Sequence, residues 1–136
     1  MDVDVEVIKP IDKFLNHGMF VGFENMSYIN MGSGFGAEKN FYLIKKMLDS
    51  YNNEPFINPA KTVNKIASPT YTTKSMKEIG FLLNNKKQTI NRTTVYPTEY
   101  FCPKDWQTGK INITKNTHTI HHFLASWLSD EEKNDI

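Results

Sequence analysis

The chain of 136 residues has little of what marks secreted, membrane-spanning or nucleic-acid-binding proteins. Its single cysteine, Cys102, excludes an internal disulfide framework and fits a reducing compartment. The formal charge of +1 gives no electrostatic reason to expect nucleic acid or an anionic membrane surface as a partner. No run approaches the roughly 18 consecutive apolar residues of a transmembrane segment, and MDVDVEVIKP lacks the basic region of a signal peptide. We therefore expect a cytoplasmic protein.

The composition, 39% hydrophobic and 23% charged, predicts one globular domain over residues 1–136. Apolar alternation and apolar runs predict strands, and apolar residues at helical spacing predict helices. The expected strands cover 3–8, 19–23, 28–31, 94–96 and 111–113. The expected helices cover 38–51 and 73–80, with a helical turn at 11–16 and a terminal helix after a capping box at 129–132. Together these elements predict the α/β class.

Two carboxylates near the start of the chain are the first candidates for chemistry. Asp2 and Asp4 stand two apart on an expected strand, so their side chains point to one face about 7 Å apart. Such a pair can hold a hard divalent cation, which typically bridges phosphates to protein. An isolated Asp-X-Asp is more often a solvated strand end, so the interpretation depends on what else the chain supplies.

The late segment His121-His122-Phe123-Leu124-Ala125-Ser126-Trp127 supplies imidazoles after a strand. A neutral histidine nitrogen suits a cation already held by carboxylates. Two carboxylates and one imidazole leave open coordination positions for diphosphate oxygens. Taken alone, the two histidines would form an ordinary pair, one packed and one exposed.

Five blocks occur in order: DVDVEVIKPID, FVGFEN, GAEKNF, YPTEYFCP and IHHFLASW. In this series the chain resembles the glycosyltransferases of family 32, the group named for a sugar-binding region that contains the DXD motif. The resemblance covers residues 1 to about 133. Bacterial members of that group are often associated with the synthesis of capsular and other surface polysaccharides.

The resemblance implies a GT-A fold with a mixed sheet flanked by helices, a divalent cation (manganese, with magnesium as the alternative), and a nucleotide-sugar donor. It also implies a glycan or glycolipid acceptor and transfer with retention. Attachment to the inner face of the membrane stays open. Carried over, Asp4 ligates the metal, Asp2 contacts the donor and also the metal through water, and His122 is the second protein ligand, with His121 as the alternative. The remaining donor-binding candidates are Gly34, Gly36, Ala37, Ser126 and Trp127, with Glu24 and Asn25 as weaker ones.

Members of that family place a nucleotide-binding βαβα half before the DXD motif. We therefore expect this chain to be the C-terminal portion of a GT-A domain, and to turn over no nucleotide sugar alone. Three alternatives follow: a truncated sequence, a first half supplied by a separate polypeptide, or an inactive remnant. A remnant would be a non-catalytic carbohydrate- or partner-binding module. A phosphohydrolase is the weaker third function, because no basic phosphate clamp follows the Asp-X-Asp.

Overall fold

The computed structural model describes residues 1–126 and 128–134. Its main sheet has five strands in the order β3-β2-β6-β5, with β4 also paired to β2. The central strands β2 and β6 run parallel, and every other pairing in this sheet is antiparallel. The bounds are β2 Met19–Phe23, β3 Ile29–Asn30, β4 Gly36–Ala37, β5 Gln88–Ile90 and β6 Thr93–Tyr96. A mixed open sheet with helices confirms the α/β class.

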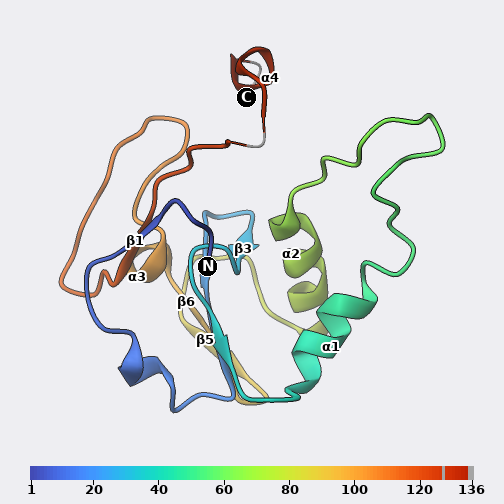
Figure 1. Ribbon diagram of the computed structural model, residues 1–136. Helices are drawn as coiled ribbons and strands as arrows, with labels where there is room; N and C mark the ends of the chain where they lie inside the picture. The colour runs from blue at the N-terminus through green and yellow to red at the C-terminus, as the bar shows by residue number, and fades with distance from the viewer. Residues whose placement is uncertain (127, 135–136) are drawn as a thin grey trace.

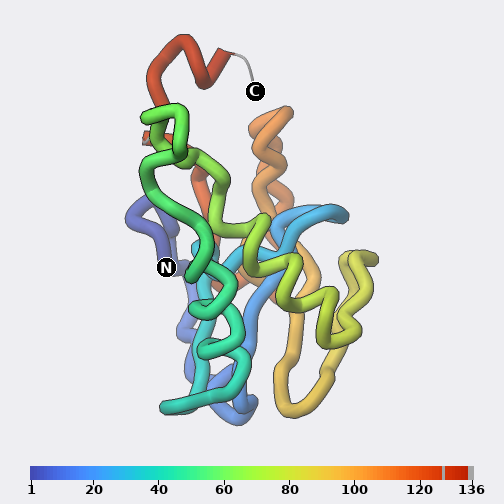
Figure 2. Tube along the Cα trace, turned by 90° about the vertical axis from the view of Figure 1, so that its right-hand side faces the viewer, coloured from blue at the N-terminus to red at the C-terminus, as the bar shows by residue number. Residues whose placement is uncertain are grey.

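Strand β2 organises two hydrophobic cores because all five of its residues are buried. Successive side chains of a strand point to opposite faces. Met19, Val21 and Phe23 face the core formed with helices α1 (Tyr42–Asp49) and α2 (Ser68–Ile79). Both helices lie to the right of the sheet in Figure 1 and in front of the strands in Figure 2. This layer carries α2, whose first residues reach the candidate site.

The opposite face of β2 holds a smaller aromatic core. Phe20 packs there with Phe14 of the 3-10 turn η1 (Asp12–Phe14), Tyr96 of β6 and Phe101 of α3 (Thr98–Phe101). Gly22 faces the same side, and a Cβ at that position would lie 2.8 Å from the Phe101 ring. Glycine is therefore required where α3 crosses the strand.

A separate two-stranded sheet joins the two ends of the described chain. Strand β1 (Val5–Val7) pairs antiparallel with β7 (Thr119–His121), with Glu6 opposite Ile120. Helix α4 (Asp130–Asn134) follows β7 in sequence and lies above both strands in Figure 1. This pairing brings residues 2–4 beside residues 121–124. It is the part of the fold that assembles the candidate site.

Several predicted elements are confirmed. The strand predicted at 19–23 has the bounds of β2. The capping box is also present, because the Ser129 amide donates to Glu132 Oε2 at 2.8 Å and the Glu132 amide donates to Ser129 Oγ at 3.3 Å. The helix predicted at 73–80 is α2, which begins earlier, at Ser68, with Pro69 in its first turn.

Other predictions differ from the structure. The chain turns at Val3 and Asp4, so the first strand begins only at Val5. Helix α1 begins at Tyr42 and ends at Asp49, and Leu48 on the predicted apolar stripe is 64% exposed. Of the strand predicted at 111–113, Ile111 alone forms an isolated bridge, to Lys104. In the described part of the chain, no helix combines the length and the apolar character needed to cross a membrane.

Candidate metal centre

Asp2, Asp4 and His121 come together beside the end of β7. One potential ligand atom of each lies within 4.8 Å of the others. His121 Nε2 is 3.2 Å from Asp2 Oδ2 and 3.8 Å from Asp4 Oδ1. The His121 and Asp4 side chains are only 7% and 13% exposed, whereas that of Asp2 is 58% exposed. The cluster therefore has two sheltered groups and one open to solvent.

The Asp4 carboxylate is held by the chain that follows β7. The Leu124 amide donates to Asp4 Oδ2 at 2.9 Å, and the His122 amide donates to the Asp4 carbonyl at 3.0 Å. These bonds leave Oδ1 turned toward His121. A charge-assisted bond from a backbone amide fixes a carboxylate more firmly than solvent does. Asp4 thus presents one oriented oxygen to the cluster.

The His121 ring is oriented by its own backbone. The Phe123 amide donates to Nδ1 at 3.0 Å, so in the neutral ring the proton is on Nε2, where it can be donated to Asp2. Phe123 has a φ of 53° and Ala125 a φ of 48°, both in the left-handed region. A cation held by Nε2 would need the proton on Nδ1. Metal binding must therefore break the hydrogen bond that the Phe123 amide donates to Nδ1. The strained turn after β7 is where that adjustment would occur.

His122, the first choice as the second protein ligand, lies elsewhere. Its Nε2 is 2.9 Å from Glu6 Oε2, and its carbonyl accepts a bond from Lys104 Nζ at 2.9 Å. Glu6 and His122 project to one side of the β1–β7 pair, while the turn at Val3 and Asp4 carries the Asp4 carboxylate round to His121. The structure therefore puts His121, the alternative, in the cluster.

Gly32 adjoins the cluster, although no sequence pattern singles it out among the neighbouring glycines. The Asp2 amide donates to the Gly32 carbonyl at 2.8 Å. A Cβ on Gly32 would collide with Asp2 Oδ2 and would lie 2.9 Å from Asn30 Oδ1. Only a residue without a side chain lets Asp2 approach here.

Replacing Gly32 by alanine should weaken Mn²⁺ binding without unfolding the protein. The new methyl group displaces the exposed Asp2 carboxylate, and loss of a positioning contact typically costs about 10- to 100-fold in metal affinity. Calorimetric titration with MnCl₂ measures the change. In the Asp2→Ala background the glycine substitution should have a much smaller effect, because only the clash with Asn30 Oδ1 is left. An equal loss in both backgrounds would contradict the assigned contact.

Glu24 extends the polar network from the end of β2. Asn30 Nδ2 donates to Glu24 Oε1 at 3.0 Å, and Asn30 Oδ1 accepts the Gly32 amide at 2.7 Å. The bonds thus run from Glu24 through Asn30 and Gly32 to Asp2. Burial raises the pKa of Glu24, although the bond from Asn30 opposes that shift. A partly buried carboxyl beside two further carboxylates makes this end of the cleft acidic.

Glu24→Gln is expected to raise the free energy of unfolding at neutral pH. Because the folded pKa of Glu24 lies above its ordinary value near 4.5, the folded state holds the proton more tightly than the unfolded chain. Its contribution to stability therefore falls as pH rises from the ordinary value through the raised one. Urea unfolding of both proteins over that interval should show a shallower decline for Glu24→Gln. Parallel curves would contradict the assignment.

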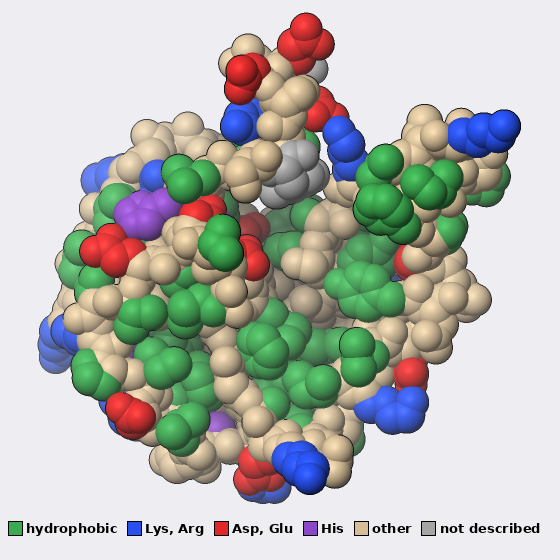
Figure 3. Space-filling model, in the orientation of Figure 1, with side chains coloured by type: hydrophobic (Ala, Val, Ile, Leu, Met, Phe, Trp, Pro, Cys, Tyr) green, Lys and Arg blue, Asp and Glu red, His purple; other side chains and the backbone are tan. Residues whose placement is uncertain are grey.

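The cluster lies in a cleft of about 1390 Å³. Figure 3 shows this hollow at the upper centre of the molecule, with acidic side chains along one side. The opposite wall is largely apolar and includes Phe56, Val63 and Ile66, which are 72%, 44% and 54% exposed. Ser68 and Pro69, in the first turn of α2, also line the cleft. One wall is thus suited to a cation and the other to an apolar surface.

The donor-binding candidates fall into three groups. Ser126 lines the cleft, and Trp127 lies outside the described residues. Gly34, Gly36 and Ala37 are absent from the described residues that line it. Gly36 and Ala37 form β4, where Gly36 packs against the Phe20 ring. The absence of a side chain at Gly36 serves strand packing in this structure.

Comparison with known proteins adds no relative. No family model, curated protein or solved structure matches the chain. The geometry of this cleft and the resemblance of the sequence blocks are therefore the two indications of function.

Proposed function

We propose that this chain is the C-terminal portion of a GT-A glycosyltransferase domain that transfers a sugar from a nucleotide-sugar donor to a glycan or glycolipid acceptor with retention. One observation carries the proposal: Asp2, Asp4 and His121, separated by more than a hundred residues in sequence, meet in one cleft. A solvated strand end would not bring a buried imidazole to the same point.

The ligand set suits manganese, with magnesium as the alternative. Carboxylate oxygens and imidazole nitrogen together favour a first-row metal such as Mn²⁺ over a purely oxygen-ligated ion. When bound, such a cation stabilises the departing diphosphate as a Lewis acid. Asp4 would hold it through the oxygen that the Leu124 bond leaves free, and His121 through Nε2. Asp2, the most exposed member, can also reach the donor.

Two features of the cleft favour a diphosphate donor and a second substrate. Helix α2 begins at the cleft after Ala67, so the positive end of its dipole favours an anion there. The cleft volume of about 1390 Å³ exceeds the roughly 300–1,000 Å³ of a typical single-ligand pocket. The exposed apolar wall is therefore available to an acceptor.

Calorimetry tests the proposal. The chain should bind Mn²⁺, and the Mn²⁺-loaded chain should bind inorganic pyrophosphate and nucleoside diphosphates, whereas Asp4→Ala should bind neither. Pyrophosphate is included because it needs no contact to a base. If Mn²⁺ binds but pyrophosphate and nucleoside diphosphates do not, the transferase proposal fails and a non-catalytic binding module is favoured.

A further inference from the structure

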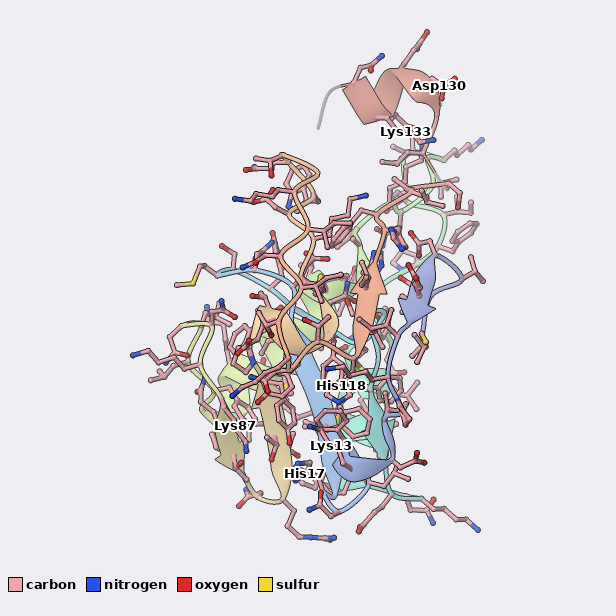
Figure 4. The ribbon with its side chains drawn as sticks, turned by 90° about the vertical axis from the view of Figure 1, so that its left-hand side faces the viewer. Lys13, His17, Lys87, His118, Asp130 and Lys133 are labelled. Atoms are coloured by element: carbon pink, nitrogen blue, oxygen red, sulfur yellow. The ribbon has the colours of Figure 1, made fainter. Side chains whose placement is uncertain are left out.

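A cluster of lysines lies on a face of the molecule away from the cleft, where four separate segments meet. Lys9 Nζ donates to the Lys115 carbonyl at 2.6 Å, which joins the segment after β1 to the segment before β7. Lys13 Nζ lies 5.3 Å from the centre of the Phe14 ring, and Lys87 Nζ lies 5.3 Å from the centre of the Tyr96 ring. Figure 4 shows Lys13 and Lys87 on this face, with His118 above Lys13 and His17 below it.

The aromatic core beneath this face holds the segments together. Phe14 packs edge-on against both Tyr96 and His118, with ring centres 5.0 and 4.8 Å apart. His17 Nε2 bonds the Tyr96 hydroxyl at 2.6 Å. The lysines therefore project from a rigid base of packed rings rather than from a free tail.

The electrostatic surroundings are cationic. Burial lowers the pKa of both histidines, and the charges that lower it further are Lys87 for His17 and Lys13 and Lys9 for His118. Asp12 lies on one of these segments, next to Lys13, and Glu99 lies on the neighbouring helix α3. Glu99 accepts a bond from Thr114 Oγ1 at 2.7 Å. The four lysines thus outnumber the carboxylates on these segments.

Each lysine-bearing segment also exposes an aliphatic side chain. Ile8 precedes Lys9, Leu15 follows Lys13, Ile113 precedes Lys115, and Leu82 is bonded through its amide to Gln88, next to Lys87. Their exposed fractions are 37%, 65%, 56% and 66%, respectively. Lysine heads beside exposed aliphatic groups suit a surface that is anionic outside and apolar just beneath. Nucleic acid would match the lysines with its negative charge, but it has no apolar layer for the exposed aliphatic side chains.

We propose that this face, named here the lysine face (Lys9, Lys13, Lys87 and Lys115), docks the protein onto an anionic lipid bilayer. The lysines interact with acidic headgroups, and the aliphatic side chains enter the interface between headgroups and acyl chains. Docking by this face is independent of the cation cluster, because the two sites share no residue.

Co-sedimentation with lipid vesicles tests the proposal. The whole chain should sediment with phosphatidylglycerol vesicles at about 0.1 M salt, much less at about 1 M salt, and not with phosphatidylcholine vesicles. Lys13→Glu/Lys87→Glu should reduce binding at least about tenfold, since each basic group near the surface contributes about fivefold. The matched control is Lys61→Glu/Lys77→Glu, which makes the same charge change at exposed sites elsewhere and should bind as the unaltered chain does.

Leu15→Ser should also weaken binding to phosphatidylglycerol, and Asp4→Ala should leave it unchanged. Circular dichroism confirms that each variant is folded. Equal loss in the lysine-face and control variants, or binding of an oligonucleotide in place of vesicles, would overturn the proposal. A failure of Mn²⁺ binding would leave it intact, so the two proposals fail separately.

Discussion

His121→Ala is expected to abolish measurable Mn²⁺ binding, whereas His122→Ala should leave the affinity unchanged. The first change removes the buried imidazole that lies 3.2 and 3.8 Å from the two carboxylates. The second removes a partner of Glu6 outside the cluster. Loss of a direct ligand should exceed the roughly 10- to 100-fold effect of an outer contact. Calorimetric titration of both variants with MnCl₂ measures the difference.

The NMR resonance of the Phe123 amide gives a second measurement, which depends directly on the His121 ring. If His121 binds the metal through Nε2, the Phe123 amide loses its acceptor, and its NMR resonance should shift on titration with a diamagnetic ion such as Mg²⁺. His122→Ala should show the same shift, and His121→Ala should show none. Equal effects of the two alanine substitutions on Mn²⁺ affinity would contradict the assignment to His121.

The sequence could propose a histidine for the site but could not choose between neighbours. Consecutive residues of a strand face opposite sides, so the choice depends on register and on where the strand ends. Had β1 continued to residue 2, Asp4 and Glu6 would share a side with His122. The turn at Val3 and Asp4 reverses that outcome, and it depends on contacts with residues 32 and 124 that are distant in sequence.

Elsewhere in the fold, elements defined by their local sequence could be predicted, and elements that depend on distant partners could not. Strand β2 was predictable because a short continuous apolar run is typical of a strand that is buried on both faces. Strand β5 was missed because its half-exposed sequence Gln-Thr-Ile pairs only with β6. The segment 32–36 contains three glycines, and the sequence does not distinguish them. In the folded chain it is Gly32, and not Gly34 or Gly36, that adjoins Asp2.

The hydrogen bonds that join Glu24, Asn30 and Gly32 could not be predicted from the sequence either. Glu24 was a weak candidate at a strand end, and Asn30 carried no signal at all. Their bond depends on the antiparallel pairing of β2 with β3, which sets Gly22 opposite Asn30. A pairing register is a property of the folded sheet, so a linear pattern of residue types does not reveal it.

Phe14→Ala is expected to lower the free energy of unfolding by about 3–5 kcal/mol, while Leu15→Ala should change it by no more than about 0.5 kcal/mol. From the sequence, both residues were available for packing on one short turn. In the structure Phe14 is 1% exposed and packs against Phe20, Tyr96 and Phe101, whereas Leu15 is 65% exposed. Three residues of η1 cannot define an apolar stripe, so the partner rings alone decide which side chain is buried.

Urea unfolding followed by circular dichroism measures both variants. The midpoint for Phe14→Ala should fall well below that of the unaltered chain with a similar slope, because the loss is a cavity and not a change in the unfolded state. A stability of about 5–15 kcal/mol is typical of such a domain, so this single truncation removes a large share of it. If Leu15→Ala destabilised as much as Phe14→Ala, the aromatic core on this face of β2 would be misassigned. The rigid base of the lysine face would then be misassigned with it.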